Sequence, residues 1–209
     1  MHLEKKISAN YNISDAKMQL SKRMRQVRRR AFGGLGSIQG KLIFEKFCEA
    51  TQKGLLIRPG DIVAGFWPIQ DEIDIRFLLQ SLCEQQIAVC LPIAGDRKTS
   101  MVFRLWKPGD RLEVGKMGLL QPSQKKQLVE PKILIIPTLA YDNFGRRLGY
   151  GGGYYDATLS ELRSRRSVTA IGVAFEAQQV PFVPNDDGDE PLDWIITEKN
   201  AKVFNNGTR

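Results

Sequence analysis

Apolar residues along this chain fall into two patterns, short continuous runs and helical stripes. The runs at 62–67 and 132–137 are typical of strands buried on both faces of a sheet. Apolar positions three or four residues apart, as at Ile75, Leu78 and Leu82, indicate amphipathic helices. We predict strands over 62–67, 87–91, 102–106, 132–137, 168–175 and 194–197, and helices from 14 or 15, from 38, over 75–83 and over 154–165.

Strands that alternate with helices predict an α/β fold, here a three-layer α/β/α single domain with a mainly parallel central sheet. A chain of 209 residues with 42% hydrophobic composition can bury a full core. We expect a flexible N-terminal segment over 1–13, one α/β domain over 14–200 and a C-terminal tail over 201–209.

The first two predicted helices meet at a cluster of glycines. Ser14 or Asp15 is the candidate N-cap of the first helix, and Gly33, Gly34 and Gly36 predict the turn that ends it. The cluster superficially resembles a dinucleotide-binding loop, but the charged residues before it do not predict the strand that such a loop follows. We therefore interpret it as a turn between helices.

Positive charge is concentrated at the start of the chain. The formal net charge is +8, and nine of the 31 basic residues lie within the first 30 positions. Such a segment either binds a polyanion or forms a solvated helix face. A nucleic-acid-binding function would leave the motifs described below unexplained, so we expect no nucleic acid. No apolar run approaches the ~20 residues that cross a bilayer, and the polar N-terminus predicts a cytoplasmic protein without a membrane contact.

Cysteine and histidine usage excludes several kinds of active site. Cys48, Cys83 and Cys90 show no C-x-x-C spacing, which indicates reduced thiols rather than a zinc site or a disulfide framework. His2 is the only histidine, so Ser-His-Asp and Cys-His catalysis are excluded.

The segment 145–156, which reads GRRLGYGGGYYD, lies between a predicted buried strand and a predicted helix. Its five glycines let backbone N–H groups approach an anion closely, and a helix N-terminus adds positive potential. A glycine-rich surface turn is the alternative. Arg147 offers a bidentate phosphate donor and Asp156 a hard oxygen ligand, and both favour a phosphate cradle.

Magnesium at a phosphate site usually takes one or two carboxylates. Asp156 supplies one, and the acidic run 186–193 supplies candidates for another just before the last predicted strand. An acidic loop on its own is more often solvated. Its position before a strand predicts that it converges with the glycine loop.

Four ordered segments give the chain a family resemblance. The stretch 147–156, RLGYGGGYYD, resembles the signature of the 5-formyltetrahydrofolate cyclo-ligase family. Residues 65–73 are similar to the folate-binding segment of the family. Residues 136–142 are similar to the segment before its glycine loop, and residues 189–194 to its final acidic segment. Order and spacing agree over roughly residues 15 to 198.

The resemblance implies an enzyme that converts 5-formyltetrahydrofolate to 5,10-methenyltetrahydrofolate, cleaves ATP to ADP and phosphate, and passes through an iminium phosphate. It implies ATP as co-substrate and Mg²⁺ held by Asp156 and Asp189. Arg147 and Tyr154 are the implied catalytic residues. The implied nucleotide-binding residues are Lys17, Arg147, Leu148, Gly149, Tyr150, Gly151, Gly152, Gly153, Tyr154 and Tyr155. The implied folate-binding residues are Trp67, Glu72, Tyr150, Gly151, Gly152, Gly153 and Tyr154.

Each folate residue also has a plainer interpretation. Trp67 could be a core aromatic residue rather than a stacking surface for the pterin. Glu72 could be an exposed helix carboxylate rather than a partner for the aminopyrimidine edge. Another ATP-dependent small-molecule ligase or kinase would have the same phosphate loop but would not need the segment from Trp67 to Glu72.

The chain departs from the family pattern in several places. Ser21 stands where the resemblance leads us to expect an arginine, with Lys22 or Arg23 as the candidate replacement. Tyr150 and Gly152 occupy positions where some relatives carry a basic residue. No sequence feature assigns a role to the basic residues at 97 and 98, and we expect a monomer.

Overall fold

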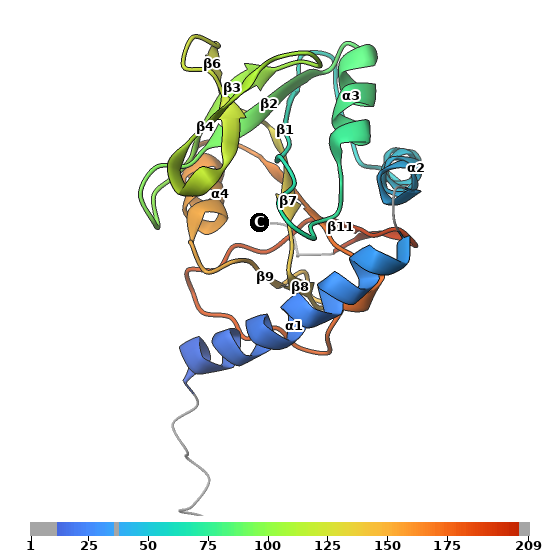
Figure 1. The fold of residues 1–209 in the computed structure, drawn as a ribbon, viewed down its shortest axis with the longest axis vertical. Coiled ribbons are helices and arrows are strands. Elements are labelled where there is room, and N and C mark those ends of the chain that lie inside the picture. Colours follow the sequence, from blue (N-terminus) through green and yellow to red (C-terminus); the bar gives the residue numbers. More distant parts are fainter. Residues whose placement is uncertain (1–11, 36–37, 205–209) are drawn as a thin grey trace, which may run out of the picture.

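The computed structural model describes residues 12–35 and 38–204, which form an eight-stranded mixed sheet flanked by helices (Figure 1). The strand order is β12-β11-β10-β7-β1-β2-β3-β6. The strands are β1 (Ile62–Ala64), β2 (Ala88–Ile93), β3 (Val102–Trp106), β6 (Leu128–Val129), β7 (Ile133–Pro137), β10 (Thr169–Val173), β11 (Trp194–Ile196) and β12 (Ala201–Val203). The central strands β2, β1, β7, β10 and β11 are parallel, and β3, β6 and β12 join antiparallel at the edges. The prediction of a mainly parallel sheet is therefore confirmed.

The described residues form four α-helices: α1 (Ile13–Leu35), α2 (Gln39–Gln52), α3 (Arg76–Glu84) and α4 (Tyr154–Arg165). The side chains of β7 show how the helices are layered. Successive strand residues point to opposite faces, so Ile133 and Ile135 join the core under α2 and α3, whereas Leu134 and Ile136 join the core under α4. The structure therefore has the predicted three layers.

Helix α1 lies across the carboxyl ends of the parallel strands, below β8 (Ala140–Tyr141) and β9 (Arg147–Leu148) in Figure 1. Met24 anchors the helix there, in a small buried cluster with Leu139, Leu148 and Val183. Ligands of open α/β sheets bind at this edge. The packing of α1 therefore brings its basic side chains to the edge where a site is expected.

Smaller elements complete the fold. The hairpin of β4 (Leu112–Val114) and β5 (Leu120–Pro122) flanks the 3₁₀-helix η2 (Lys116–Gly118), and the 3₁₀-helix η3 (Glu176–Gln178) follows β10. Strand β1 ends at Ala64, before the predicted end at 67. Residues 65–75 therefore leave the sheet and run toward its carboxyl edge.

The ends of α1 differ from the prediction. Asn12 is its N-terminal capping residue, because its side-chain oxygen accepts hydrogen bonds from the backbone N–H groups of Ser14 (3.0 Å) and Asp15 (3.4 Å). The predicted turn at Gly33 and Gly34 is wrong, since the helix continues through both glycines to Leu35. A glycine inside a helix costs about 1 kcal/mol. Packing of Ala31, Phe32 and Leu35 against the core offsets that cost.

The end of the chain contributes a strand that the sequence did not predict. Residues 201–203, assigned above to the tail, form β12 and pair with β11, so that Ala201 lies opposite Ile196. The remaining parts of the expected terminal segments, 1–11 and 205–209, lie outside the described residues, as do His2 and Gly36.

Candidate active site

A glycine-rich loop, residues 149–153, joins β9 to α4 at the carboxyl edge of the sheet. Gly151 and Gly153 have φ angles of 80° and 71°, a region that glycine adopts without strain. Gly153 is the N-cap of α4, and no described side chain caps the helix. Glycine offers no side-chain acceptor to the first turn of α4, and the helix dipole adds roughly half a positive charge there, which favours an anion.

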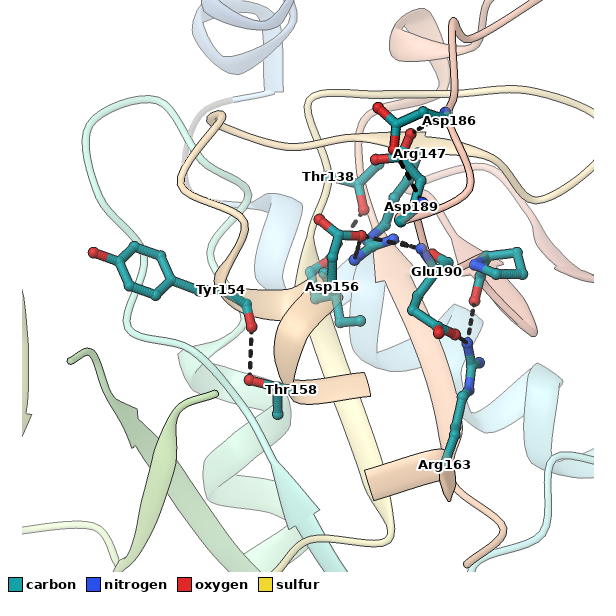
Figure 2. Close-up of polar contacts among 12 residues, drawn as sticks. Thr138, Arg147, Tyr154, Asp156, Thr158, Arg163, Asp186, Asp189 and Glu190 are labelled. Carbon is teal, nitrogen blue, oxygen red and sulfur yellow. Dashed lines mark hydrogen bonds and ion pairs between the residues drawn. The ribbon is translucent and has the colours of Figure 1, made fainter. Parts of the chain in front are cut away.

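Arg147 ties this loop to the acidic segment, as Figure 2 shows. Its side chain is buried, its Nη2 lies 2.8 Å from Asp156 Oδ1, and its Nη1 donates to the carbonyl of Glu190. Asp156 Oδ1 also accepts the backbone N–H of Glu190 at 3.1 Å. One guanidinium thus joins β9, the first turn of α4 and residues before β11, which confirms the predicted convergence of the two segments.

The acidic segment also reaches α1 through Lys17. Lys17 Nζ lies 2.9 Å from Asp186 Oδ2 and 2.5 Å from Asp189 Oδ2. Burial opposes the charge on Lys17, but the hydrogen bonds to these two carboxylates outweigh it and raise its pKa above the ordinary value. The structure therefore brings together two residues that the sequence assigned to nucleotide and metal.

Arg163 is a supporting residue that the sequence analysis missed. From α4 it donates to Glu190 Oε2 (2.7 Å), to the carbonyl of Pro191 (3.0 Å) and to Asp193 Oδ2 (2.8 Å). Its sequence signal is a basic residue near the C-terminal end of the predicted helix, a position that the helix dipole favours. Arg163 therefore holds the acidic segment against α4, and Figure 2 shows its contact with Glu190.

The carboxylates here fit a magnesium ion by their donor atoms. Hydrogen bonds among the described residues use Oδ1 of Asp156 and Oδ2 of Asp189, which leaves the other oxygen of each without a protein donor. No group of three or more acidic, cysteine or histidine side chains within the described residues forms a closed metal cage. Magnesium in nucleotide enzymes usually binds one or two carboxylates, with phosphate oxygens and water as its other ligands.

Glu72 lies on a second side of the site, in the segment that follows β1. It is buried, so the interpretation as an exposed helix carboxylate is wrong. Its Oε2 accepts the backbone N–H of Ile69 at 3.0 Å, and its side chain is hydrogen-bonded to that of Tyr150. Burial raises the pKa of Glu72, and these two hydrogen bonds oppose the shift only in part.

Arg28 organises this second side and was also missed. It is 3% exposed and donates to the hydroxyl of Tyr150 and to Asp71. Its Nε is buried without a hydrogen-bond partner among the described residues. Arg28 lies eleven positions after Lys17, three helical turns along the same face of α1. That spacing is the sequence signal that could have identified it.

A small cavity lies beside Arg28, between α1 and the carboxyl ends of β7 and β10. Its lining mixes apolar side chains with the buried polar groups of Glu72 and Gln178. The lining residues are Arg28, Phe66, Glu72, Ile73, Pro137, Thr138, Val173, Ala174 and Gln178.

Trp67 is half-buried and faces the α3 side of the sheet. Its ring packs edge-on against Trp106, with centroids 5.8 Å apart, and the guanidinium of Arg76 lies 5.7 Å from its centroid. Trp67 therefore has a packing role, as its plainer interpretation held, while part of the side chain stays exposed.

The other predicted contacts differ in how far their side chains face the loop. Leu148 is buried in the cluster around Met24, so only its backbone lies at the site. Tyr155 is half-buried against the core under α4. The ring of Tyr154 turns away from Arg147 and Asp156 in Figure 2 and folds back beside Gly152, where an added Cβ would lie 2.7 Å from it.

The basic residue next to Ser21 is Arg25, one helical turn further along α1. Arg25 Nε lies 3.4 Å from Ser21 Oγ, and its guanidinium lies 5.1 Å from the centroid of the Tyr150 ring. Lys22 and Arg23 are exposed. Arg25 therefore contacts Tyr150 of the glycine loop, and the role of Lys22 or Arg23 as a replacement for the arginine stays a prediction.

A glycine-rich loop with carboxylates and a lysine at the carboxyl edge of an α/β sheet is typical of the class of enzymes that act on phosphate-containing ligands. Among the described residues, no helix is long and apolar enough to span a membrane. The sequence profile of the 5-formyltetrahydrofolate cyclo-ligase family matches residues 13–198. The chain belongs to this family, and its activity is that of a 5-formyltetrahydrofolate cyclo-ligase in folate one-carbon metabolism.

Individual relatives agree with this assignment. A 5-formyltetrahydrofolate cyclo-ligase from Haemophilus influenzae is 33% identical over 139 residues, 64% of this chain and 74% of the relative. One from Escherichia coli is 29% identical over 140 residues, 65% of this chain and 76% of the relative. The NMR structure of 5,10-methenyltetrahydrofolate synthetase from Aquifex aeolicus has a TM-score of 0.70 at 26% identity, and the match covers 92% of this chain and 95% of that one.

Proposed function

We propose that this site converts 5-formyltetrahydrofolate to 5,10-methenyltetrahydrofolate in two steps. The formyl oxygen first attacks the γ-phosphorus of ATP, ADP leaves, and an iminium phosphate forms. The amine nitrogen N10 of the folate then attacks the formyl carbon, the C–O bond to phosphate breaks, and N10 loses its proton. Both steps need positioning and charge stabilisation rather than a nucleophilic side chain.

The glycine loop and α4 form the nucleotide side in this proposal. Backbone N–H groups of residues 148–155 bind the phosphates, and Lys17 adds a positive charge from α1. Arg147 holds the loop and the acidic segment together and places its charge beside the transferred phosphoryl group. Tyr154 lies at the end of the loop, between the nucleotide and the folate.

Asp156 and Asp189 would hold Mg²⁺ through the oxygens that accept no protein hydrogen bond. When bound, the ion neutralises charge on the phosphate oxygens of ATP. The protein contributes the orientation of the two carboxylates: Arg147 and the backbone of Glu190 fix Asp156, and Lys17 fixes Asp189.

The folate side is formed by Trp67, Glu72 and Tyr150. We propose that the exposed part of the Trp67 ring stacks on the pterin. Glu72 accepts hydrogen bonds from the aminopyrimidine edge, where its buried position strengthens them. Tyr150 belongs to the glycine loop and is hydrogen-bonded to Glu72, so it fixes the distance between the folate and nucleotide sides.

The observation that carries the proposal is the ion pair between Arg147 and Asp156, because it places a carboxylate with one unused oxygen at the open N-terminus of α4. The test mixes purified protein with 5-formyltetrahydrofolate, ATP and Mg²⁺ and follows the near-ultraviolet absorbance of the methenyl product. We expect product only with ATP, and a kcat at least about a hundredfold lower in Asp156→Asn.

Asp187→Asn is the matched control, because Asp187 is an exposed carboxylate in the same acidic segment. It removes the same charge and should leave kcat within about twofold of the unsubstituted protein. An Asp156→Asn variant that keeps full activity would contradict the metal site. ATP cleavage without methenyl product would contradict the proposed reaction.

We further propose that the enzyme works as a cytoplasmic monomer, since one chain supplies every side chain assigned above. Gel filtration with light scattering should then give a mass close to 23.6 kDa. A dimer at assay concentrations would contradict this part of the proposal.

A further inference from the structure

The turn between β2 and β3 contacts the glycine loop. The backbone N–H of Lys98 donates to the carbonyl of Gly152 at 3.0 Å. A Cβ added to Gly153 would lie 3.1 Å from Cγ of Lys98, so the lysine stem packs against the N-cap of α4. This turn therefore forms a further wall of the phosphate cradle, separate from α1 and from the acidic segment.

The backbone of Lys98 is strained. Three described residues other than glycine have a positive φ: Gln70, Gln86 and Lys98, whose φ is 61°. Gln86 follows the end of α3, where a left-handed residue is a common way to terminate a helix. Gln70 lies between Trp67 and Glu72, at the folate side. Strained residues cluster at ligand-binding sites, and Lys98 is the one that lies at the nucleotide side.

The structure around Lys98 holds this conformation in place. Thr99 Oγ1 donates to the carbonyl of Asp96 at 2.6 Å, and the backbone N–H of Thr99 donates to the same carbonyl at 3.2 Å. Lys116 pairs with Asp96 at 2.8 Å. The turn is thus closed on one side and hydrogen-bonded to Gly152 on the other, which keeps Lys98 at its tip.

The ammonium group of Lys98 has no hydrogen-bond or ion-pair partner among the described residues. The side chain is exposed. Lys98 therefore adds a positive charge beside a loop whose glycines carry no charge of their own.

We propose that Lys98 is a nucleotide-binding residue whose ammonium contacts the triphosphate above Gly152 and Gly153. The inference rests on the proposed function of the glycine loop and adds the turn between β2 and β3 to the site. A lysine there supplies the positive charge that the backbone N–H groups alone lack.

The test compares Lys98→Gly with Arg97→Ala, which removes an equal charge one residue earlier. Glycine relieves the strain at φ 61°, so the melting temperature of Lys98→Gly should equal or exceed that of the unsubstituted protein. Calorimetric titration in Mg²⁺ should show ATP bound about tenfold more weakly by Lys98→Gly. Adenosine binding should stay unchanged, Arg97→Ala should bind ATP normally, and Lys98→Arg should bind it within about threefold.

Unchanged ATP affinity in Lys98→Gly would overturn the inference, and so would an equal loss for ATP and adenosine, which would indicate a structural role. The methenyl assay keeps this outcome apart from the proposed function. If the unsubstituted protein makes no product but Lys98→Gly still loses affinity for ATP and not for adenosine, the proposed reaction is contradicted and the proposed role of Lys98 is supported. If the unsubstituted protein binds no ATP, both the proposed reaction and the proposed role of Lys98 are contradicted.

Discussion

The two proposed sides of the active site each contain one buried arginine, and the carboxylates that pair with these arginines lie at different separations along the sequence. On the nucleotide side, Arg147 pairs with Asp156, nine positions along the chain. On the folate side, Arg28 binds Asp71, 43 positions away, and Tyr150, 122 positions away. The ion pair of Arg147 lies within a single motif, although the same guanidinium also donates to the carbonyl of Glu190, 43 positions away. Both partners of Arg28 lie in other segments.

The arginines also differ in how completely they are paired. The two terminal nitrogens of Arg147 both donate to protein acceptors, whereas Arg28 has a buried Nε without a partner in the described structure. An unsatisfied buried donor costs about 1–3 kcal/mol. Among the described residues, Arg28 on the proposed folate side is therefore less completely paired than Arg147 on the proposed nucleotide side.

The largest expected effect is that of Arg147→Met. Removing one partner of a buried ion pair leaves the other uncompensated, so we expect a loss of about 3 kcal/mol in the free energy of unfolding, measured by urea denaturation. The KM for ATP should rise at least about tenfold. Arg146→Met is the control, since Arg146 is partly exposed and lies 3.8 Å from Asp142, and it should cost less than about 1 kcal/mol. If both variants lost the same free energy of unfolding, the buried pair of Arg147 and Asp156 would have no special role in stability.

Arg28→Met should have a smaller effect on stability, about 2 kcal/mol, because it removes the unsatisfied Nε together with the ion pair to Asp71. The kinetic effect should fall on the other substrate. We expect the KM for 5-formyltetrahydrofolate to rise about tenfold and that for ATP to change by less than about twofold. Arg29→Met, at the next and exposed position, should leave both unchanged. If Arg28→Met raised the KM for ATP as much as the KM for 5-formyltetrahydrofolate, the division of the site into two sides would be wrong.

Glu72→Gln tests the burial of the folate-side carboxylate through pH. The pKa of Glu72 is raised in the folded protein, above the ordinary value of 4.5, because the side chain is buried. Its ionisation therefore costs stability as pH rises through the folded-state pKa, a cost that the neutral glutamine does not have. The free energy of unfolding of Glu72→Gln relative to the unsubstituted protein should increase from about pH 4 to pH 7. The exposed Glu113→Gln should show no such trend, and a flat difference for Glu72→Gln would argue against a buried carboxylate.

Lys17→Ala should have the smallest effect on folding. Its contacts with Asp186 and Asp189 are partly exposed, so the loss in unfolding free energy should stay below about 1 kcal/mol. The KM for ATP should nevertheless rise about tenfold, because the charge lies beside the glycine loop. Arg30→Ala, at an exposed position of the same helix, should change neither quantity. A folding loss above that limit would mean that Lys17 has mainly a structural role.

The sequence determined much of the fold, because its signals are local. Continuous apolar runs identified the central strands, and apolar stripes at helical spacing identified helices. The helix α4 was predicted with its observed bounds. Two-residue strands such as β8 and β9, and the edge strand β12, carry too few residues to produce a pattern. The extension of α1 through Gly33 and Gly34 depended on packing, which overrides helix propensity.

The same distinction holds for the site. A contiguous motif with glycines, Arg147 and Asp156 indicated phosphate and metal chemistry because backbone geometry and donor type are encoded residue by residue. Only the tertiary structure decided that Arg28 is buried beside Tyr150 and that Lys98 lies over Gly152. Those contacts join segments that come together when α1 packs across the carboxyl edge of the sheet and the turn after β2 folds over the loop. The spacing of Arg28 from Lys17 indicates a shared helix face, but contacts between distant segments are not encoded locally in the sequence.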